Sequence, residues 1–471
     1  MSDVLLIYLL VVLLTMLAFI PLVGAIWAKS RHKLVDIFEP IYGATMYFVL
    51  IFAIRSVYAL RVGTIFMGDP PFDVETRQAW IMALVYLTIA ICAFMVTYYS
   101  GLGAALARAV PPLPQDWAPA RLWVVVPALA LIGLIALGAL VEYFGGLEAY
   151  LANKQRTLTE GGTTYLYTLV GCLWLGTVAS YVGQLEYGWP AIFTWCLLAL
   201  TVVIMATTGS KGLTVFPVLS LVIVRHYIKR PLGVGKLLAL GFFGLPLVPL
   251  FNIYRHATSV DEIVPEWIGV MLTPEVFLTH VISRFHDMDA FVTIIRDTPK
   301  VMDFQLGATL LPLATAWIPR AVWADKPVVS FGKTFGETYW AQFFAGTGSA
   351  PSVTVLGEGY INFHIAGVVS VAALSGLILR AVYQYLVKGG TTSGILVYSV
   401  IYGPYLVMFW ESDIVGLLTR ALIWSALAMS VTILLGRPRS AGRGITRNRV
   451  GLPGTSGWIQ PINVPDPART E

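Results

Sequence analysis

The hydrophobic pattern of this chain is a series of long apolar runs separated by short polar loops. The first run, VLLIYLLVVLLTMLAFIPLVGAIW, is continuous, whereas the strands of a membrane barrel would alternate apolar and polar residues. Runs of about 20 apolar residues predict transmembrane helices, because a helix satisfies its own backbone hydrogen bonds in lipid. We therefore expect an all-α polytopic integral membrane protein with about 11 spans, at roughly 4–28, 40–60, 78–100, 122–142, 164–183, 189–208, 212–225, 236–252, 364–387, 394–411 and 417–435.

One long interruption divides this pattern. We expect a bundle of about 8 spans over 1–251, a large outward-facing loop over 252–363, about 3 spans over 364–435 and a disordered basic cytoplasmic tail over 436–471. Two apolar stretches inside the loop could be interpreted as a further span. IVPEWIGVMLTPEVFLTHVI holds two carboxylates and two prolines, and GATLLPLATAWI has only about 12 residues, which is short for a crossing. Both are therefore predicted to be interfacial or re-entrant amphipathic helices.

Composition and charge placement support this reading. The 471 residues are 57% hydrophobic and 12% charged. Basic residues of the short loops fall on one side if there are eleven spans, which predicts a cytoplasmic C-terminus and an N-terminus on the outer side. The three cysteines lie inside predicted spans, so neither a disulfide framework nor a zinc site is expected, and no other metal or cofactor is predicted. The chain shows no P-loop or dinucleotide fingerprint, which argues against a cytosolic nucleotide-sugar donor.

Two outward-facing connections carry candidate phosphate ligands. Lys154 and Arg156 lie between Gly-rich flanks in a loop beside the outer boundary, where a guanidinium can grip phosphate oxygens with two hydrogen bonds. The alternative is that both are solvated loop cations. Lys211 lies in the turn TTGSKGL, which is too short to leave the membrane surface, and the alternative is a lysine that reaches from a helix end to water.

The large loop begins with a dense polar group. Arg255 leaves the eighth predicted span, and Arg284, His286 and Asp287 follow within an amphipathic stretch. A helix would place Arg284 and Asp287 on one face, which predicts either a structural ion pair or a phosphate ligand beside an acid–base partner.

The centre of the same loop reads IPRAVWADKP, in which prolines surround Arg320, Trp323 and Lys326. The indole can stack on a sugar, and the two cations can neutralise phosphate. A loop that ends an interfacial helix would contain many of the same residues. Further on, GEGYINFH places Glu358 between glycines just before the ninth span, with Tyr360 close by. A partly desolvated carboxylate there can act as a base, or it can pair with an arginine.

Other charged residues lie in or beside the predicted spans. Four charged residues lie at outer helix ends, where we expect them to support the substrate-contacting residues or to reach from the helix end to water: Arg55, Glu142, Glu411 and Asp413. Arg380 and Arg420 fall inside spans, where an ionisable group is a functional candidate, and the sequence supplies no partner for either.

Taken in order, the strings EYFGGLEAYLANKQR, GSKG, SRFHDMD, IPRAVWADKP and PSVTVLGEGYINFHIAG resemble the bacterial O-antigen polymerase family, also called oligosaccharide repeat-unit polymerases. The resemblance covers the chain from about the fourth span to the ninth. By position, the arginines expected in two outward loops of that family match Arg156 in the smaller loop and Arg284 or Arg320 in the larger. Many members have arginine where this chain has Lys211, which keeps the charge and loses the bidentate fork.

The resemblance implies a metal-independent membrane glycosyltransferase of the bacterial inner membrane, acting on its periplasmic face. It would transfer a growing glycan from one polyprenyl diphosphate to a repeat unit on another, and so make an O-antigen or exopolysaccharide. Its partners would be the lipid-linked donor and acceptor, membrane lipid, and a chain-length regulator and flippase of the same pathway, with no nucleic acid. Alternatives are an O-antigen ligase-like transferase, a flippase for lipid-linked oligosaccharide and a non-catalytic scaffold for other envelope enzymes.

This interpretation assigns roles to two sets of residues. The leaving diphosphate gains charge that cations can stabilise without a metal, while a base removes the acceptor proton. The catalytic candidates are Arg156, Arg284, Arg320, Glu358 and His286, with Glu358 or His286 as the base. Candidates for binding the diphosphate or the sugar are Lys154, Lys211, Arg255, Trp323, Lys326 and Tyr360.

Overall fold

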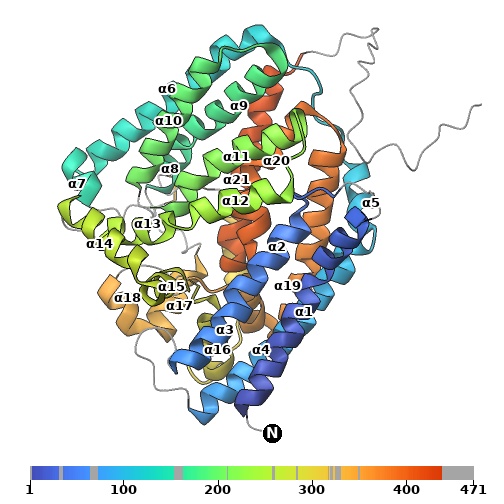
Figure 1. Ribbon diagram of the computed structural model, residues 1–471, viewed down its shortest axis with the longest axis vertical. Helices are drawn as coiled ribbons and strands as arrows, with labels where there is room; N and C mark the ends of the chain where they lie inside the picture. Colours follow the sequence, from blue (N-terminus) through green and yellow to red (C-terminus); the bar gives the residue numbers. More distant parts are fainter. Residues whose placement is uncertain are drawn as a thin grey trace, which may run out of the picture.

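The architecture was analysed in a computed structural model (Figure 1). It describes residues 3–30, 35–63, 73–152, 163–208, 210–256, 260–282, 285–316, 318, 322–323, 330–347 and 351–437. Within these ranges the chain is helical and forms no β-strand. The prediction of an all-α polytopic membrane protein is confirmed.

Nine helical rods in the described ranges are long and apolar enough to cross a membrane. Three of them contain π-helical or 3₁₀ segments, and one is broken at a single glycine. The rods are α1 (Asp3–Ser30), α2–η1–α3 (Pro40–Phe48, Val49–Ile54, Arg55–Val62), α4 (Val74–Tyr99), α6 (Pro119–Tyr143), α8–α9 (Thr164–Val170, Cys172–Tyr187), α11 (Lys211–Ile228), α19–η4 (Val355–Tyr383, Gln384–Lys388), α20–η5–η6 (Thr392–Ile401, Tyr402–Val407, Met408–Glu411) and α21 (Ile414–Leu435).

Two predicted spans take a shorter form. The apolar run 189–208 folds as α10 (Ala191–Thr207), a helix of 17 residues. The run 236–252 folds as two helices, α12 (Val234–Gly244) and α13 (Leu247–His256), which are separated at Leu245 and Pro246. Proline lacks the backbone N–H that a continuing helix needs, which explains why a continuous apolar run is divided here.

The described parts of the large loop fold as short helices. The apolar stretch 263–282 divides into α14 (Val260–Leu272), with 13 residues, and α15 (Pro274–Ile282), with 9 residues. Neither helix is long enough to cross a bilayer core of about 30 Å. The remaining short elements of the chain are α5 (Leu102–Ala109), α7 (Leu147–Ala152), α16 (Asp287–Asp297), η3 (Ala308–Ala314), α17 (Phe331–Tyr339) and α18 (Ala341–Thr347).

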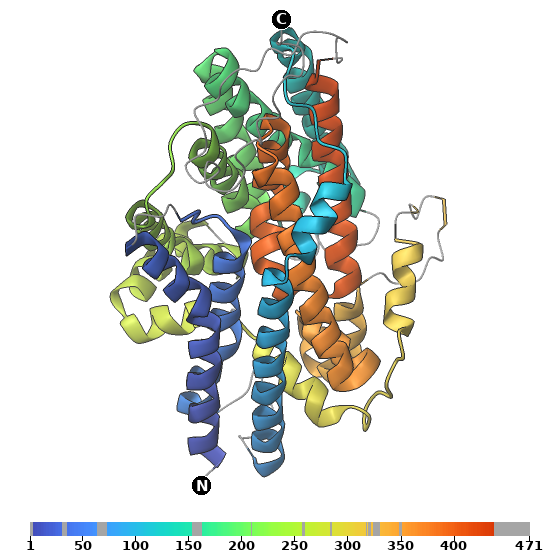
Figure 2. The same ribbon diagram turned by 90° about the vertical axis from the view of Figure 1, so that its right-hand side faces the viewer.

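Helix ends meet at two opposite ends of the bundle. At one end α7, α14, α16 and α18 gather along one edge of Figure 1, and we call this end the loop face. The opposite end holds the connections 35–39, 100–118, 188–190, 229–233 and 436–437, and we call it the basic face because Arg108, Arg230, Lys388 and Arg437 lie there. Figure 2 gives the view turned by 90°, in which α1 and α4 run side by side.

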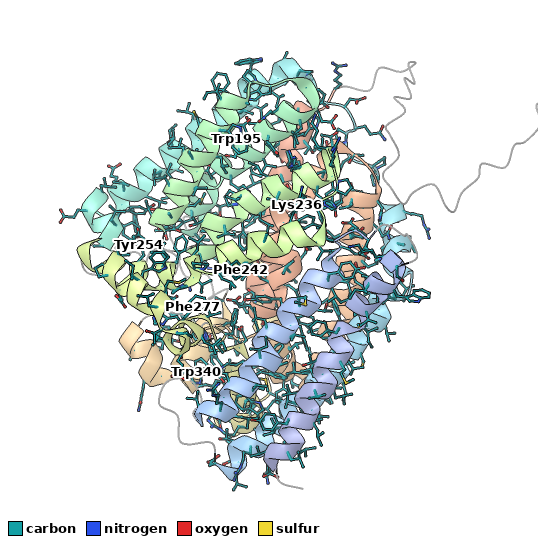
Figure 3. All side chains as sticks on the ribbon, in the orientation of Figure 1. Trp195, Lys236, Phe242, Tyr254, Phe277 and Trp340 are labelled. Atoms are coloured by element: carbon teal, nitrogen blue, oxygen red, sulfur yellow. The ribbon has the colours of Figure 1, made fainter. Side chains whose placement is uncertain are left out.

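Printed contacts join segments that are far apart in sequence within each face. At the loop face, Arg296 donates to Thr76 at 3.2 Å. At the basic face, the backbone N–H of Arg437 donates to the carbonyl oxygen of Asp116 at 3.0 Å. Among labelled side chains, Tyr254, Phe277 and Trp340 lie toward the loop face (Figure 3). The alternation of connections between two ends is the arrangement expected of a polytopic bundle.

Small residues allow close packing between helices of the bundle. A methyl group on Gly376 of α19 would lie 2.2 Å from the carbonyl oxygen of Phe94 in α4. Beside it, the Thr97 hydroxyl donates to the carbonyl oxygen of Ala373 at 2.7 Å. Membrane helices associate through such close backbone approach, because lipid supplies no hydrophobic drive between them. The α4–α19 pair therefore fixes the long helix that leads to the loop face.

The first eight residues of α19 fold back on the rest of the helix. The break lies at Phe363 (φ −140°, ψ 27°) and at His364, whose positive φ of 53° is rare for a residue with a side chain. A methyl group on Gly367 would lie 1.9 Å from the carbonyl oxygen of Gly359, so the two arms touch at glycines. The predicted ninth span, 364–387, starts at this break, and the residues before it form a separate short arm.

Candidate functional site

Several predicted site residues lie outside the described part of the chain. They are Lys154, Arg156, Arg284, Arg320 and Lys326, together with the side chain of Arg255. Their roles stay predictions. The described neighbours of two of these segments do meet, because the Tyr165 hydroxyl donates to the carbonyl oxygen of Ile318 at 3.4 Å. Tyr165 follows Arg156 in the sequence, and Ile318 precedes Arg320.

Glu358 is the fully buried centre of a polar cluster at the loop face. Thr354 begins its helix, and the Thr354 side chain accepts from the backbone N–H of Gly357 at 2.8 Å. The Glu358 side chain is 0% exposed. One carboxylate oxygen accepts from the Thr309 hydroxyl at 2.7 Å, and the other accepts from the backbone N–H of Ile414. That N–H belongs to the first turn of α21, where unsatisfied N–H groups and the helix dipole favour a negative charge.

Asn362 extends this cluster into a directed chain of hydrogen bonds. Its amide nitrogen donates to the Thr309 hydroxyl at 2.7 Å and to the carbonyl oxygen of Glu358 at 2.9 Å. Its amide oxygen accepts from the backbone N–H of Gly307 at 2.8 Å. The Thr309 hydroxyl accepts from Asn362, which leaves its only proton for Glu358. Sequence reasoning quoted the strings that contain Thr309 and Asn362 but gave neither residue a role, because neither side chain carries a charge.

Asp413 lies at the same helix N-terminus as Glu358. Its carboxylate caps α21 by accepting from the backbone N–H of Gly416, and it accepts from the Ser330 hydroxyl at 3.1 Å. The sequence predicted a supporting or snorkelling role for Asp413, and the structure gives it this capping contact. Two carboxylates therefore share the positive end of one helix, and each uses a different N–H.

The polar group around His286 forms a second cluster. The described backbone is non-helical at Phe285 and His286, and α16 begins at Asp287, so the helix that the sequence suggested is interrupted at 285 and 286. Arg284 lies outside the described residues. The Ser352 hydroxyl donates to Asp287 at 2.5 Å. The His286 ring lies 6.0 Å from the Trp340 ring.

Arg55 anchors α16 from the far side of this second cluster. The sequence predicted that Arg55 would support substrate-contacting residues or reach to water. Its side chain is instead 4% exposed and pairs with the fully buried Asp289. Its Nη2 and Nε lie 2.7 and 2.9 Å from one carboxylate oxygen. Such a pair is structural, because removal of either partner would leave a buried charge uncompensated.

Lys211 joins three helices instead of lying in an open turn. It is the first residue of α11, and its ammonium donates to the amide oxygen of Asn252 in α13. The amide nitrogen of Asn252 donates in turn to the carbonyl oxygen of His280 in α15, at 3.1 Å. The part-buried cation is thus held at the loop face, directly beside the helix that continues to Arg255.

The two predicted aromatic ligands differ in exposure. Trp323 is 40% exposed. Tyr360 is 3% exposed, and its ring contacts His364 and Tyr86 with centroids 4.8 and 5.9 Å apart. Tyr360 lies two residues from Glu358, so it projects from the opposite side of their short helix and packs into the core. Of the two, Trp323 offers a free ring for a sugar.

The structure supplies partners that the sequence did not reveal for the two arginines inside spans, Arg380 at the basic face and Arg420 near the loop-face start of α21. Arg380 pairs with Glu39 at 2.6 Å, and Glu39 also accepts from the Tyr98 hydroxyl at 3.0 Å. Arg420 donates to the Ser412 hydroxyl at 2.6 Å. Burial raises the pKa of Glu39 even though Arg380 opposes that rise.

Asp36 completes the network at the basic face. It accepts from the hydroxyls of Tyr383 at 2.7 Å and Tyr227 at 3.0 Å, and it faces His226 at 3.4 Å. The His226 Nδ1 accepts from the backbone N–H of Leu232 at 2.9 Å, which assigns a proton on Nε2 toward Asp36. Burial disfavours the Asp36 charge, but the hydrogen bonds from His226 and Tyr383 outweigh it and lower the Asp36 pKa.

Comparison with known proteins adds no relative to this description. No protein-family model matches the chain, and no curated protein and no solved structure does so either.

Proposed function

We propose that this protein is a membrane glycosyltransferase that polymerises oligosaccharide repeat units carried on polyprenyl diphosphate. The observation that carries the proposal is the buried carboxylate of Glu358, which is held by neutral donors at the loop face. None of its described hydrogen-bond partners is a cation. A base must be able to accept a proton, and a carboxylate that no cation neutralises meets this condition better than an ion-paired one.

In the proposed reaction a proton leaves the acceptor hydroxyl, and negative charge develops on the leaving diphosphate. The acceptor hydroxyl oxygen bonds to the anomeric carbon of the donor glycan, while the bond from that carbon to the diphosphate oxygen breaks and its electron pair leaves on the diphosphate. Glu358 takes the hydroxyl proton. Arg156, Arg284, Arg320 and Lys211 stabilise the charge on the leaving group, a role that positioned cations perform in other transfers of this kind.

The arrangement of the site adds one structural requirement. Glu358 is covered by Thr309 of η3, so we expect η3 to move when an acceptor sugar binds. Trp323 then supplies an exposed ring beside the segment of Arg320. His286 is the second candidate base, and its position at the start of α16 sets it apart from the Glu358 cluster.

The bacterial inner membrane is the proposed location, with the loop face toward the periplasm. Support comes from the cations on the connections of the opposite face, since cytoplasmic loops of membrane proteins carry an excess of Lys and Arg. Labelling of single cysteines placed at Glu337 and Arg108 with a membrane-impermeant reagent tests this in cells. We expect labelling at 337 only; labelling at 108 only would reverse the orientation.

The decisive experiment uses purified protein in detergent with lipid-linked repeat units as the sole substrate. A polymerase lengthens the glycan, with no membrane to separate compartments. A flippase produces no longer product, and a ligase needs a separate acceptor before it transfers anything. Unchanged glycan length in the presence of correctly folded protein would overturn the proposal.

A further inference from the structure

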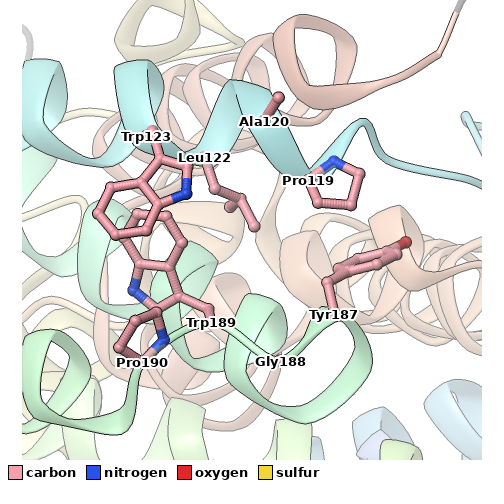
Figure 4. A pocket seen from close by; sticks show the side chains of 8 residues that line it. All are labelled: Pro119, Ala120, Leu122, Trp123, Tyr187, Gly188, Trp189 and Pro190. Carbon is pink, nitrogen blue, oxygen red and sulfur yellow. The ribbon is translucent and has the colours of Figure 1, made fainter.

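The pocket that opens at the basic face offers no cation to a charged ligand. It has a volume of about 210 Å³ and lies between the start of α6 and the turn from α9 to α10 (Figure 4). Trp123 and Trp189 lie side by side in its lining, with ring centroids 4.4 Å apart, and none of the lining residues is charged. An exposed cation inside a span is found instead toward the loop face, at Arg420.

Arg420 is exposed on a face of α21 that otherwise packs against the bundle. Trp424 lies four residues further along α21, and therefore on the same face, and is only 7% exposed. Leu422 and Ile433 mark the outer side of the helix, at 65% and 63% exposed. The packed face of α21 thus becomes accessible one turn nearer the loop face, at the position of Arg420.

Aromatic rings close the bundle on the other side of Arg420, toward the basic face. The Trp424 ring lies 5.0 Å from the Trp174 ring of α9, and the Trp174 ring lies 6.3 Å from the Phe216 ring of α11. A methyl group on Gly403 of η5 would lie 2.7 Å from the Phe216 ring, so a fourth rod joins this layer. A ligand therefore reaches Arg420 from the loop face and not through the bundle.

The Arg420 guanidinium has donors to spare. Among the described residues it forms no ion pair, and it donates to the Ser412 hydroxyl at 2.6 Å. A guanidinium carries five N–H donors in a fork that matches phosphate oxygens. The Tyr405 hydroxyl of η5 lies close enough to interact electrostatically with Arg420, and it donates no hydrogen bond within the described residues. Together the two side chains favour an anion with several oxygens.

The anchor of Arg420 places it near Glu358. Arg420 is held at Ser412, and Glu358 accepts from the backbone N–H of Ile414. Two residues of chain span at most about 7 Å, so the cation and the proposed base are held at neighbouring points of one segment. The reaction needs such a spacing, because the base meets the acceptor hydroxyl on one side of the anomeric carbon and the diphosphate leaves on the other.

We propose that Arg420, assisted by the Tyr405 hydroxyl, binds the diphosphate of the polyprenyl carrier. This inference rests on the proposed function and adds to it a diphosphate ligand from inside a span. The guanidinium donates two parallel hydrogen bonds to oxygens of one phosphate, and Tyr405 donates to a further oxygen.

The test titrates the full chain, purified in detergent, with farnesyl diphosphate and with farnesol, and measures binding by native mass spectrometry. Farnesol has the same prenyl chain and no diphosphate. We expect Arg420→Gln to weaken farnesyl diphosphate binding about tenfold and to leave farnesol binding unchanged, because only charge-assisted hydrogen bonds are lost. Arg108→Gln removes an exposed arginine at the basic face, and this matched control should bind like wild type.

Two results would overturn the proposal. One is wild-type affinity for farnesyl diphosphate in Arg420→Gln. The other is displacement of farnesyl diphosphate by phosphatidylglycerol at equal concentration, which would make Arg420 a ligand for the headgroups of bulk lipid. Should Arg420→Gln fold poorly, Arg420→Lys decides in its place. It keeps a cation without the fork and should bind several-fold more weakly, so wild-type affinity in that variant would overturn the proposal too.

Failure of the proposed function would give a different result. Wild-type protein would then bind farnesyl diphosphate through Arg420 and still not lengthen lipid-linked glycan. Glycan elongation by wild type, together with normal farnesyl diphosphate binding by Arg420→Gln, would instead leave the function standing and remove only the role of Arg420.

Discussion

The two faces of the molecule hold buried carboxylates in opposite electrostatic settings. At the basic face, Arg380 pairs with Glu39, and His226 and two tyrosines surround Asp36. At the loop face, Glu358 receives a threonine hydroxyl and a helix N–H, with no cation among its described partners. The first setting fixes charge in place and joins helices. The second leaves a carboxylate whose charge an incoming group can change.

The Arg55–Asp289 pair gives the sharpest contrast with Glu358, because it is equally buried and fully paired. Asp289→Ala leaves the guanidinium without its partner, so the free energy of unfolding should fall by about 3–5 kcal/mol. Thermal denaturation of the purified protein measures this. The double variant Arg55→Met with Asp289→Leu should recover most of the loss; equal stability of the single and double variants would contradict the ion-pair account.

At the basic face, Arg380→Met should lower the free energy of unfolding by about 2 kcal/mol. The loss is smaller than for a fully buried pair, since the Arg380 side chain is 25% exposed. Elongation activity per folded molecule should stay at the wild-type level, because the network is structural. A loss of activity with unchanged stability would mean that this face takes part in the reaction.

Thr309→Val should instead reduce activity strongly and stability only slightly. It removes the hydroxyl that donates to Glu358 and accepts from Asn362, while the volume stays similar. We expect elongation to slow about tenfold, with a loss of stability of about 1 kcal/mol. Thr315→Val, in the turn after η3, serves as the control and should leave the rate unchanged. A Thr309→Val enzyme at full speed would remove the positioning role.

The smallest expected effect is the response of Asp36 to acid. The Asp36 pKa is lowered in the folded protein, so its stabilising contribution is complete above its unfolded value of 3.8 and is lost as pH falls through the lowered value. Asp36→Asn should therefore flatten the fall in thermal stability below pH 4. If thermal stability fell equally steeply below pH 4 in Asp36→Asn, other carboxyls would be responsible for that fall.

The spans could be predicted from the sequence because lipid imposes one requirement on the backbone over about 20 residues. The polar networks could not, since each depends on residues distant in the chain. Arg380 and Glu39 lie 341 positions apart, and Thr309 reaches Glu358 across 49. The sequence nevertheless singled out Glu358, because a carboxylate between glycines beside a span is itself unusual, and its catalytic role stays a prediction.

The breaks inside apolar runs were the second feature that was not predicted from the sequence. The division of 236–252 follows from Pro246, a signal that hydropathy averaging hides. The fold-back at His364 has no such signal, because it depends on Gly359 and Gly367 meeting across the turn. The segments that carry Arg156, Arg284 and Arg320 lie outside the described residues, so their joint role stays a prediction of the sequence.

The central claim is that Glu358 accepts the acceptor proton, and its most direct test is the elongation rate of purified variants on lipid-linked repeat units. Glu358→Gln should slow elongation by about 100-fold or more, the loss expected when a positioned base is removed. Glu337→Gln, a change at a half-exposed carboxylate of the same large segment, should leave the rate unchanged. A folded Glu358→Gln protein that elongates at the wild-type rate would contradict the account.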